Sequence, residues 1–108
     1  VQPSAVRAGG MHEILNVAED AYRFGALCIP HTWCHVVGVA AQIHLAAVAP
    51  NMPYFEFPIA FPPSPLVENL LIPQFEISVD GTMSVPDRPG LGFELNEDVV
   101  SDFRVDPY

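Results

Sequence analysis

The chain contains no lysine, and its four arginines face thirteen acidic residues, which gives a formal net charge of −9. This shortage of positive charge argues against nucleic-acid binding, because contacts to phosphates require a basic surface. It also argues against attachment to an anionic membrane surface. No apolar run reaches the roughly 20 residues that span a bilayer, and we expect no secretory leader, because the sequence shows none with a basic start. We therefore expect neither nucleic acid nor a membrane as a partner.

Cysteine is also scarce, with only Cys28 and Cys34 in 108 residues. Both lie in apolar surroundings, so reduced and buried thiols are favoured over a disulfide, and a cytoplasmic protein is expected. What the chain has in quantity is apolar residues, at 50% of its composition. Its length suits one small domain or a part of a larger one.

The first half of the sequence predicts alternating strands and helices. Apolar residues recur at helical spacing after the Gly9–Gly10 pair, and Gly25 stands where such a helix would stop. Short apolar runs ending at prolines suit strands that are buried on both faces. The expected order is strand 1–3, helix 11–24, strand 26–30, helix 34–48 and strand 52–57. Such an order indicates an α/β protein with parallel βαβ units.

The second half differs in character. Residues 58–74 are rich in proline and predict an irregular stretch. Alternating apolar residues around Asp80–Gly81 predict a hairpin over residues 75–86, because Asp-Gly is a strong turn signal. Residues 87–95 are expected to form a loop, and Asn96 is a plausible N-cap for a short helix after it.

Three polar residues stand at the ends of the three predicted strands, namely Ser4, His31 and Glu56. In an α/β barrel the carboxyl ends of the strands carry the active site. Histidine can exchange a proton near neutral pH, and a protonated carboxylic acid can donate to developing negative charge. The alternative is structural: His31 caps the next helix, and Glu56 is a solvated residue at the rim. A Ser/His/acid hydrolase is disfavoured because no Gly-x-Ser-x-Gly turn surrounds Ser4.

Two further patterns indicate a binding site more weakly, one for a metal ion and one for a phosphate. His31, Cys34, His35 and His44 cluster in the sequence and make a small metal-binding module an alternative. However, His31 follows Pro30 at a strand end, so it would not share a helix face with His35, and no established ligand frame is present. The glycines at 9 and 10 suit a tight turn into a helix better than a phosphate cradle.

Four motifs in a fixed order resemble one family. They are VQPSAVRAGGMHEILNVAEDAYRFG at residues 1–25, IPHTW at 29–33, PNMPYFEFP at 50–58 and DGTMSVPDRPGLGFELNEDVV at 80–100. Together they are similar to the mandelate racemase and muconate lactonizing groups of the enolase superfamily. The resemblance implies that residues 1–58 form the last strands and helices of a TIM-type (β/α) barrel, its C-terminal third. Residues 59–108 would be a C-terminal segment that returns to the capping domain.

The resemblance also implies roles for the three strand-end residues. His31 matches the family's general acid/base histidine, and Glu56 matches the glutamate that hydrogen-bonds the substrate carboxylate as it becomes an enediolate. Ser4 stands where the family has an aspartate that orients the histidine and increases its basicity. Serine can accept a hydrogen bond but brings no charge, so His31 is expected to be a weaker base here. The family's magnesium ligands and its lysine base would lie outside this chain.

The implied activity is magnesium-dependent abstraction of a proton α to a carboxylate, in an acid-sugar dehydratase or a racemase. The chain would be inactive alone. Its expected partners are the remaining N-terminal part of the enzyme, as a separate chain or segment, and a small carboxylate such as an acid sugar. The intact protein is expected to be a homo-oligomer. The replacement at Ser4 leaves a second possibility open, that of a non-catalytic or less active homologue.

Overall fold

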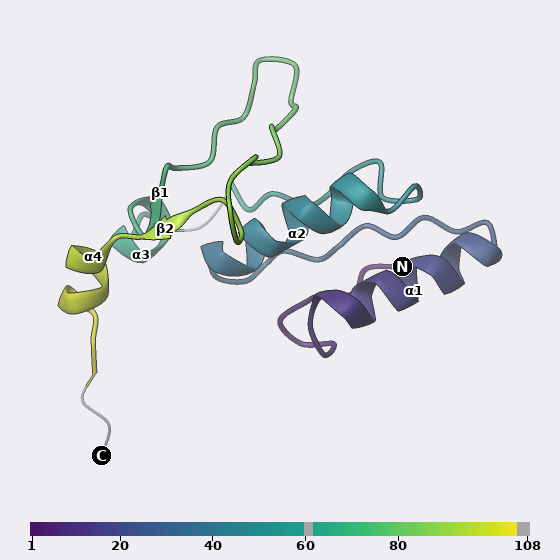
Figure 1. The fold of residues 1–108 in the computed structure, drawn as a ribbon, viewed down its shortest axis with the longest axis horizontal. Helices are drawn as coiled ribbons and strands as arrows, with labels where there is room; N and C mark the ends of the chain where they lie inside the picture. Colours follow the sequence, from purple (N-terminus) through teal and green to yellow (C-terminus); the bar gives the residue numbers. More distant parts are fainter. Residues whose placement is uncertain (60–61, 106–108) are drawn as a thin grey trace. The chain divides into compact units, whose positions relative to one another are not determined.

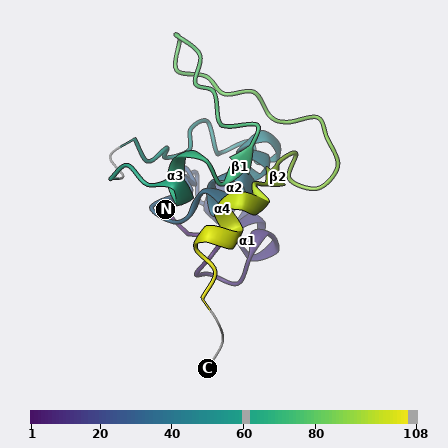
Figure 2. The same ribbon diagram turned by 90° about the vertical axis from the view of Figure 1, so that its left-hand side faces the viewer.

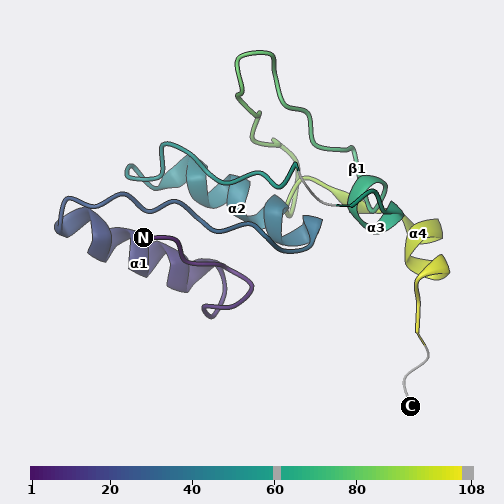
Figure 3. The same ribbon diagram turned by 180° about the vertical axis from the view of Figure 1, so that it is seen from behind.

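The computed structural model describes residues 1–59 and 62–105, and the chain divides into two compact units, Val1–Ile59 and Ala60–Tyr108. The first unit holds α1 (Met11–Arg23) and α2 (Val36–Val48). Figure 1 shows these two helices running in the same direction, with the chain between them running back, and Figure 3 shows the same arrangement from behind. This is the course of two successive strand–helix units, as the sequence predicts.

Helix α1 forms where apolar residues recur at helical spacing. Its buried face consists of Ile14, Ala18 and Ala21, which agrees with the predicted amphipathic pattern. Gly10 is the N-cap and has a φ of 95°, a value that residues with a side chain rarely adopt. The predicted tight turn into the helix is therefore confirmed.

Helix α2 begins two residues later than predicted. The prediction placed His35 inside a helix over residues 34–48, but His35 is the N-cap and its Nδ1 accepts a hydrogen bond from the Gly38 amide at 3.2 Å. A ring nitrogen in this position satisfies one of the free amides of the first turn, which is why the helix starts after it. Gly38 is also packed closely, because a Cβ there would lie 2.6 Å from Cys34 Sγ.

The three strands predicted in this unit are extended segments without regular strand structure. Residues 1–3 and 27–31 nevertheless pair in the parallel manner: the Val1 amine donates to the Leu27 carbonyl at 2.7 Å, and the Ile29 amide donates to the Val1 carbonyl at 2.9 Å. Between the second and third segments one backbone-to-backbone bond is present, from the Cys28 amide to the Asn51 carbonyl at 2.9 Å. Pairing this sparse does not complete a regular ladder.

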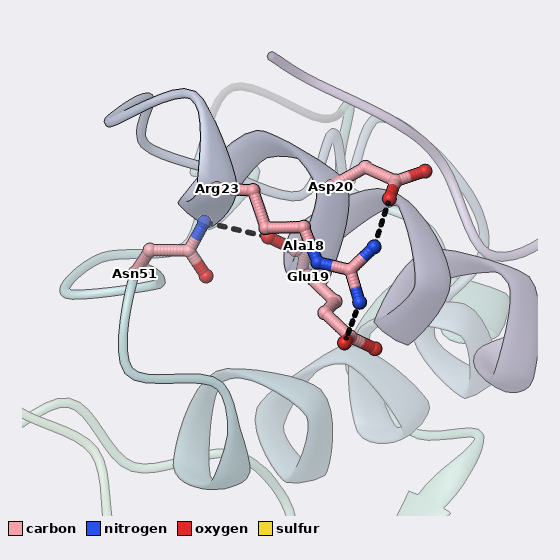
Figure 4. Close-up of polar contacts among 5 residues, drawn as sticks. All are labelled: Ala18, Glu19, Asp20, Arg23 and Asn51. Atoms are coloured by element: carbon pink, nitrogen blue, oxygen red, sulfur yellow. Dashed lines mark hydrogen bonds and ion pairs between the residues drawn. The ribbon is translucent and has the colours of Figure 1, made fainter.

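The core of the first unit lies between α1, α2 and these segments. Its buried members are Ala5, Ile14, Ala18, Ala21, Cys28, Leu45 and Met52. Asn51 is buried beside them and donates hydrogen bonds to the Ala18 carbonyl at 2.9 Å and the Ala26 carbonyl at 3.1 Å. Figure 4 shows its amide directed at the backbone of α1, while Arg23 contacts Glu19 and Asp20 on the same helix. The Asn51 side chain thus joins the connection that follows α2 to helix α1 and to the connection that follows α1.

The second unit contains α3 (Pro65–Glu68), β1 (Leu71–Ile72), β2 (Glu94–Leu95) and α4 (Glu97–Asp102). The two strands pair antiparallel, with Leu71 opposite Leu95 and Ile72 opposite Glu94. Figure 2 shows the long loop between β1 and β2, and α4 following directly from β2. Asn96 caps α4 through its side chain, which accepts from the Asp98 amide at 3.2 Å, as predicted.

The sequence-based account of this unit needs correction at three points. The stretch 58–74 is not wholly irregular, because α3 and β1 lie within it, and residues 94–95 of the expected loop form β2. The hairpin over 75–86 is wrong: the turn at Asp80–Gly81 exists, with the Ser78 amide bonded to the Thr82 carbonyl at 2.8 Å, but no strands flank it. Both arms are largely exposed, and so little burial stabilises a ladder.

Candidate functional site

Ser4 and His31 lie at the ends of neighbouring extended segments. The His31 amide donates to the Pro3 carbonyl at 2.9 Å, and this parallel register sets Ser4 level with His31. Ser4 begins a turn in which its carbonyl accepts from the Arg7 and Ala8 amides at 3.0 and 2.8 Å. Its side chain is only 7% exposed, and its Oγ has no hydrogen-bond partner among the described residues. A buried hydroxyl without a partner is rare in proteins, so the position has unused capacity for a hydrogen bond.

Glu56 is tied to the residue next to His31. The Thr32 amide donates to Glu56 Oε2 at 2.9 Å, and the Thr32 hydroxyl donates to the Glu56 backbone carbonyl. Thr32 is 0% exposed, whereas His31 and Glu56 are half-buried. The carboxylate of Glu56 is therefore held at the end of the His31 segment rather than left at a solvated rim.

Gln42 supports this segment end from helix α2. Its Nε2 donates to the His31 carbonyl at 2.9 Å and lies 4.0 Å from Cys34 Sγ. Gln42 is fully buried, and its Oε1 has no partner among the described residues. The backbone of His31 is thus held from one side by Pro3 and from the other by Gln42.

Charged groups of the site act on the Cys34 thiol. Burial is the largest influence and raises the pKa of Cys34. The hydrogen bond with Gln42 and the positive charge of Arg7 oppose that rise in the pKa, and the negative charge of Glu56 adds to it. The charges of Arg7 and Glu56 therefore both influence the pKa of Cys34, which lies just before α2.

The histidines and cysteines that cluster in the sequence are not gathered into a group of metal ligands in the part of the chain that the structure describes. Within residues 1–59 and 62–105, no group of three or more His, Cys, Asp or Glu side chains is arranged to hold a metal ion. Cys28 and Cys34 are both free thiols, as expected. The structure gives the metal-module alternative no support.

Two residues of this site escaped the sequence analysis, Thr32 and Gln42. The signal for Gln42 was present in the sequence, since it is one of few polar residues in an otherwise apolar helical stretch, and the structure shows it to be fully buried. Thr32 carried no such signal, because its partner Glu56 lies 24 residues away in the chain.

Comparison with known proteins identifies the family. The family model described as "Enolase C-terminal domain-like" matches residues 1–99 of the chain. The chain therefore belongs to the enolase C-terminal domain-like family, and the resemblance drawn from the four motifs is confirmed.

Several relatives with assigned activities match nearly the whole chain. The D-galactarolactone cycloisomerase of Agrobacterium fabrum is 34% identical over 113 residues, which is 97% of this chain and 29% of that protein. The L-talarate/galactarate dehydratase of Salmonella typhimurium is 34% identical over 97 residues, covering 90% of this chain and 21% of that protein. The chain thus spans less than a third of the length of these relatives.

Solved structures agree with this assignment. A protein of Bordetella bronchiseptica RB50 assigned as a mandelate racemase, complexed with 2-oxoglutarate/phosphate, matches with a TM-score of 0.87 and 31% identity over all of this chain and 28% of its own. The mandelate racemase/muconate lactonizing enzyme of Jannaschia sp. CCS1 matches with a TM-score of 0.81 and 33% identity, over 99% of this chain and 26% of its own. The chain therefore has the enolase C-terminal domain-like α/β fold.

Proposed function

We propose that this chain is the C-terminal third of the barrel, with a capping-domain segment, of a magnesium-dependent enzyme that abstracts a proton α to a carboxylate. The substrate class is an acid sugar, and the reaction is dehydration or racemisation. Support comes from the family and from relatives that include a galactarate dehydratase and a cycloisomerase of a sugar lactone. The observation that carries the proposal is the pairing of segment ends: Ser4 level with His31, and Glu56 fixed to Thr32.

His31 is the general acid or base in this proposal. It exchanges a proton with the α-carbon or delivers one to a leaving hydroxyl group, which histidine can do near neutral pH. Glu56 donates a hydrogen bond to the carboxylate-derived oxygens as the enediolate forms, because an ionised glutamate would repel that charge. Ser4 replaces the aspartate that would orient His31, and it leaves His31 without a charged partner there.

The magnesium site is proposed to lie outside the part of the chain that the structure describes. No group of three or more His, Cys, Asp or Glu side chains among the described residues could hold a metal ion, and in this proposal the magnesium ligands come from other strands of the intact enzyme. The same applies to a lysine base, since this chain contains no lysine. The proton transfers assigned to His31 and the hydrogen bond assigned to Glu56 need no metal ligand from this chain.

The intact enzyme is further proposed to be a homo-oligomer in the cytoplasm. The cytoplasm is favoured by two free cysteines in apolar surroundings, which suit a reducing compartment. No helix among the residues that the structure describes is long and apolar enough to cross a membrane.

The test is α-proton exchange by the intact protein in deuterated buffer, with magnesium and a panel of acid sugars. His31→Asn should abolish exchange at the position that His31 serves while leaving substrate binding nearly unchanged. Glu56→Gln should be milder, because an amide still donates a hydrogen bond, and the loss of one donor typically costs about 10²- to 10³-fold at most. An inactive Glu56→Gln protein beside a nearly normal His31→Asn protein would reverse the roles.

A second candidate function is a non-catalytic or less active homologue, and the uncharged Ser4 favours it. In that case the intact wild-type protein would bind acid sugars without exchanging the α-proton. Exchange above the rate without protein would exclude the non-catalytic form.

A further inference from the structure

Thr32 contacts Glu56 at two separate points. The backbone amide of Thr32 donates to Glu56 Oε2 at 2.9 Å, and its hydroxyl donates to the Glu56 carbonyl. One bond fixes the end of the side chain, and the other fixes the backbone from which that side chain starts. We propose that Thr32 is a positioning residue for Glu56, an inference that rests on the function proposed for this site.

Burial makes these two bonds effective. Thr32 is 0% exposed, so water does not compete for its donors, and a hydrogen bond away from water is stronger than the same bond in solvent. A free glutamate side chain has many rotamers, and ordering one during the reaction costs conformational entropy. The bonds from Thr32 order the Glu56 side chain when the protein folds, before the substrate reacts. The donor is then already in the geometry that the transition state requires.

The contact also assigns the two oxygens of Glu56 to different tasks. A backbone amide can only donate, so Oε2 must act as an acceptor toward Thr32. The hydrogen that Glu56 offers to the substrate is therefore carried by Oε1. Glutamine at position 56 can reproduce both tasks, with its carbonyl oxygen on the Thr32 amide and its NH₂ group in place of Oε1. Aspartate is one methylene shorter and cannot keep both contacts.

The same segment end is held a second time. Gln42 donates to the His31 carbonyl at 2.9 Å, so the peptide that leads into Thr32 is fixed from helix α2. The peptide group between His31 and Thr32 is therefore held at both its carbonyl oxygen and its amide, which restricts its rotation. Together these bonds keep His31 and Glu56, which come from separate segments, at a fixed position relative to each other.

The kinetic test uses the intact enzyme. Thr32→Val removes the hydroxyl while keeping the shape, and it should lower kcat roughly 10-fold with KM within about two-fold of wild type. Thr32→Ser keeps the hydroxyl and should restore most of the activity. Thr82→Val is the matched control, because Thr82 is the only other threonine in these 108 residues and its hydroxyl bonds to Asp80 in the second unit. The kcat of Thr82→Val should not change. Glu56→Asp should lose more activity than Glu56→Gln.

A second measurement detects the contact without needing turnover. With ¹⁵N-threonine labelling of the intact protein, the Thr32 amide should lose protection from exchange and change its chemical shift in Glu56→Ala. In Glu56→Gln it should stay close to wild type, since an acceptor remains, and the Thr82 signal should not move in either variant.

The outcomes separate this inference from the function on which it rests. An active wild type with an unchanged kcat in Thr32→Val would overturn the positioning role and leave the proposed function intact. Equal losses in Thr32→Val and Thr32→Ser, together with lower melting temperatures, would reduce Thr32 to a structural residue and overturn the inference. A wild type without α-proton exchange, but with the expected response of the Thr32 amide, would overturn the function while the clamp on Glu56 stands.

Discussion

Ser4 combines a buried position with an unused hydroxyl, and it lies level with His31. We predict that Ser4→Asp increases the rate of α-proton exchange by the intact protein, because a carboxylate beside an imidazole stabilises its protonated form. The gain should be roughly 10-fold. The measurement is exchange in deuterated buffer at one fixed pH near neutrality.

Ser4→Asn is the control for Ser4→Asp, because it has the same size without the charge. It should give no comparable gain in exchange. A Ser4→Asp protein that is no faster than Ser4→Asn would mean that the side chain at position 4 does not serve His31.

The Cys34 thiol offers a pH-dependent test of the charges at this site. Because burial raises its pKa, the thiol stays protonated near neutral pH, and its alkylation by iodoacetamide should be slow and should increase as the pH rises. Arg7→Gln removes a positive charge that lowers the pKa of Cys34, so alkylation at a given alkaline pH should become slower still. Peptide mass spectrometry reports the rate at Cys34 alone.

Arg88→Gln is the matched control for Arg7→Gln, because it removes the same charge from the second unit and should leave the reactivity of Cys34 unchanged. Faster alkylation in Arg7→Gln would show that Arg7 does not act on the thiol in the intact protein.

At the scale of elements, Asn51 joins the connection after α2 to α1 and to the connection after α1, although these lie far apart in the sequence. Asn51→Ala removes both donors and leaves the Ala18 and Ala26 carbonyls without these partners. We predict a loss of about 2–4 kcal/mol in the free energy of unfolding, since each bond contributes about 1 kcal/mol and a buried group left unpaired costs more. Urea denaturation of the intact protein measures this loss.

The control for Asn51→Ala is Asn69→Ala. Asn69 is exposed and accepts one hydrogen bond from Gln74 at 3.1 Å. Its replacement should change the free energy of unfolding by less than about 0.5 kcal/mol. Equal effects at both positions would contradict the special role of Asn51.

At the scale of the whole molecule, the first unit leaves much apolar surface uncovered. Phe24 is 90% exposed and Tyr54 is 70% exposed, and residues 1–3 have a backbone partner on one edge only among the described residues. Exposed apolar patches and open strand edges are characteristic of surfaces that bind other polypeptide. They fit the proposal that the remaining barrel strands cover them.

We predict that the 108-residue chain expressed alone self-associates or unfolds, and that it forms a stable complex with a polypeptide that supplies the upstream strands. Analytical ultracentrifugation of the two polypeptides, separately and mixed, measures this. A compact monomer of the isolated chain with cooperative thermal unfolding would refute the prediction.

Local features of the fold were open to prediction from the sequence. The periodicity of α1, the glycine turn before it, the Asn96 cap and the Asp80–Gly81 turn all depend on residues within a few positions of one another. The family was also predicted, because its motifs are short and lie in a fixed order. The two-residue strands β1 and β2 were missed, since so short a run has no period to detect.

The sequence by itself therefore determined where α1, α2 and α4 lie and which family the chain belongs to, and it singled out three candidate residues at the ends of the predicted strands. Only the tertiary structure decided that Thr32 holds Glu56, that Gln42 holds His31, and that the Ser4 hydroxyl has no partner among the described residues. The physical reason is distance along the chain. The bond between Thr32 and Glu56 joins residues 24 positions apart and exists only after α2 has packed and brought two segment ends together.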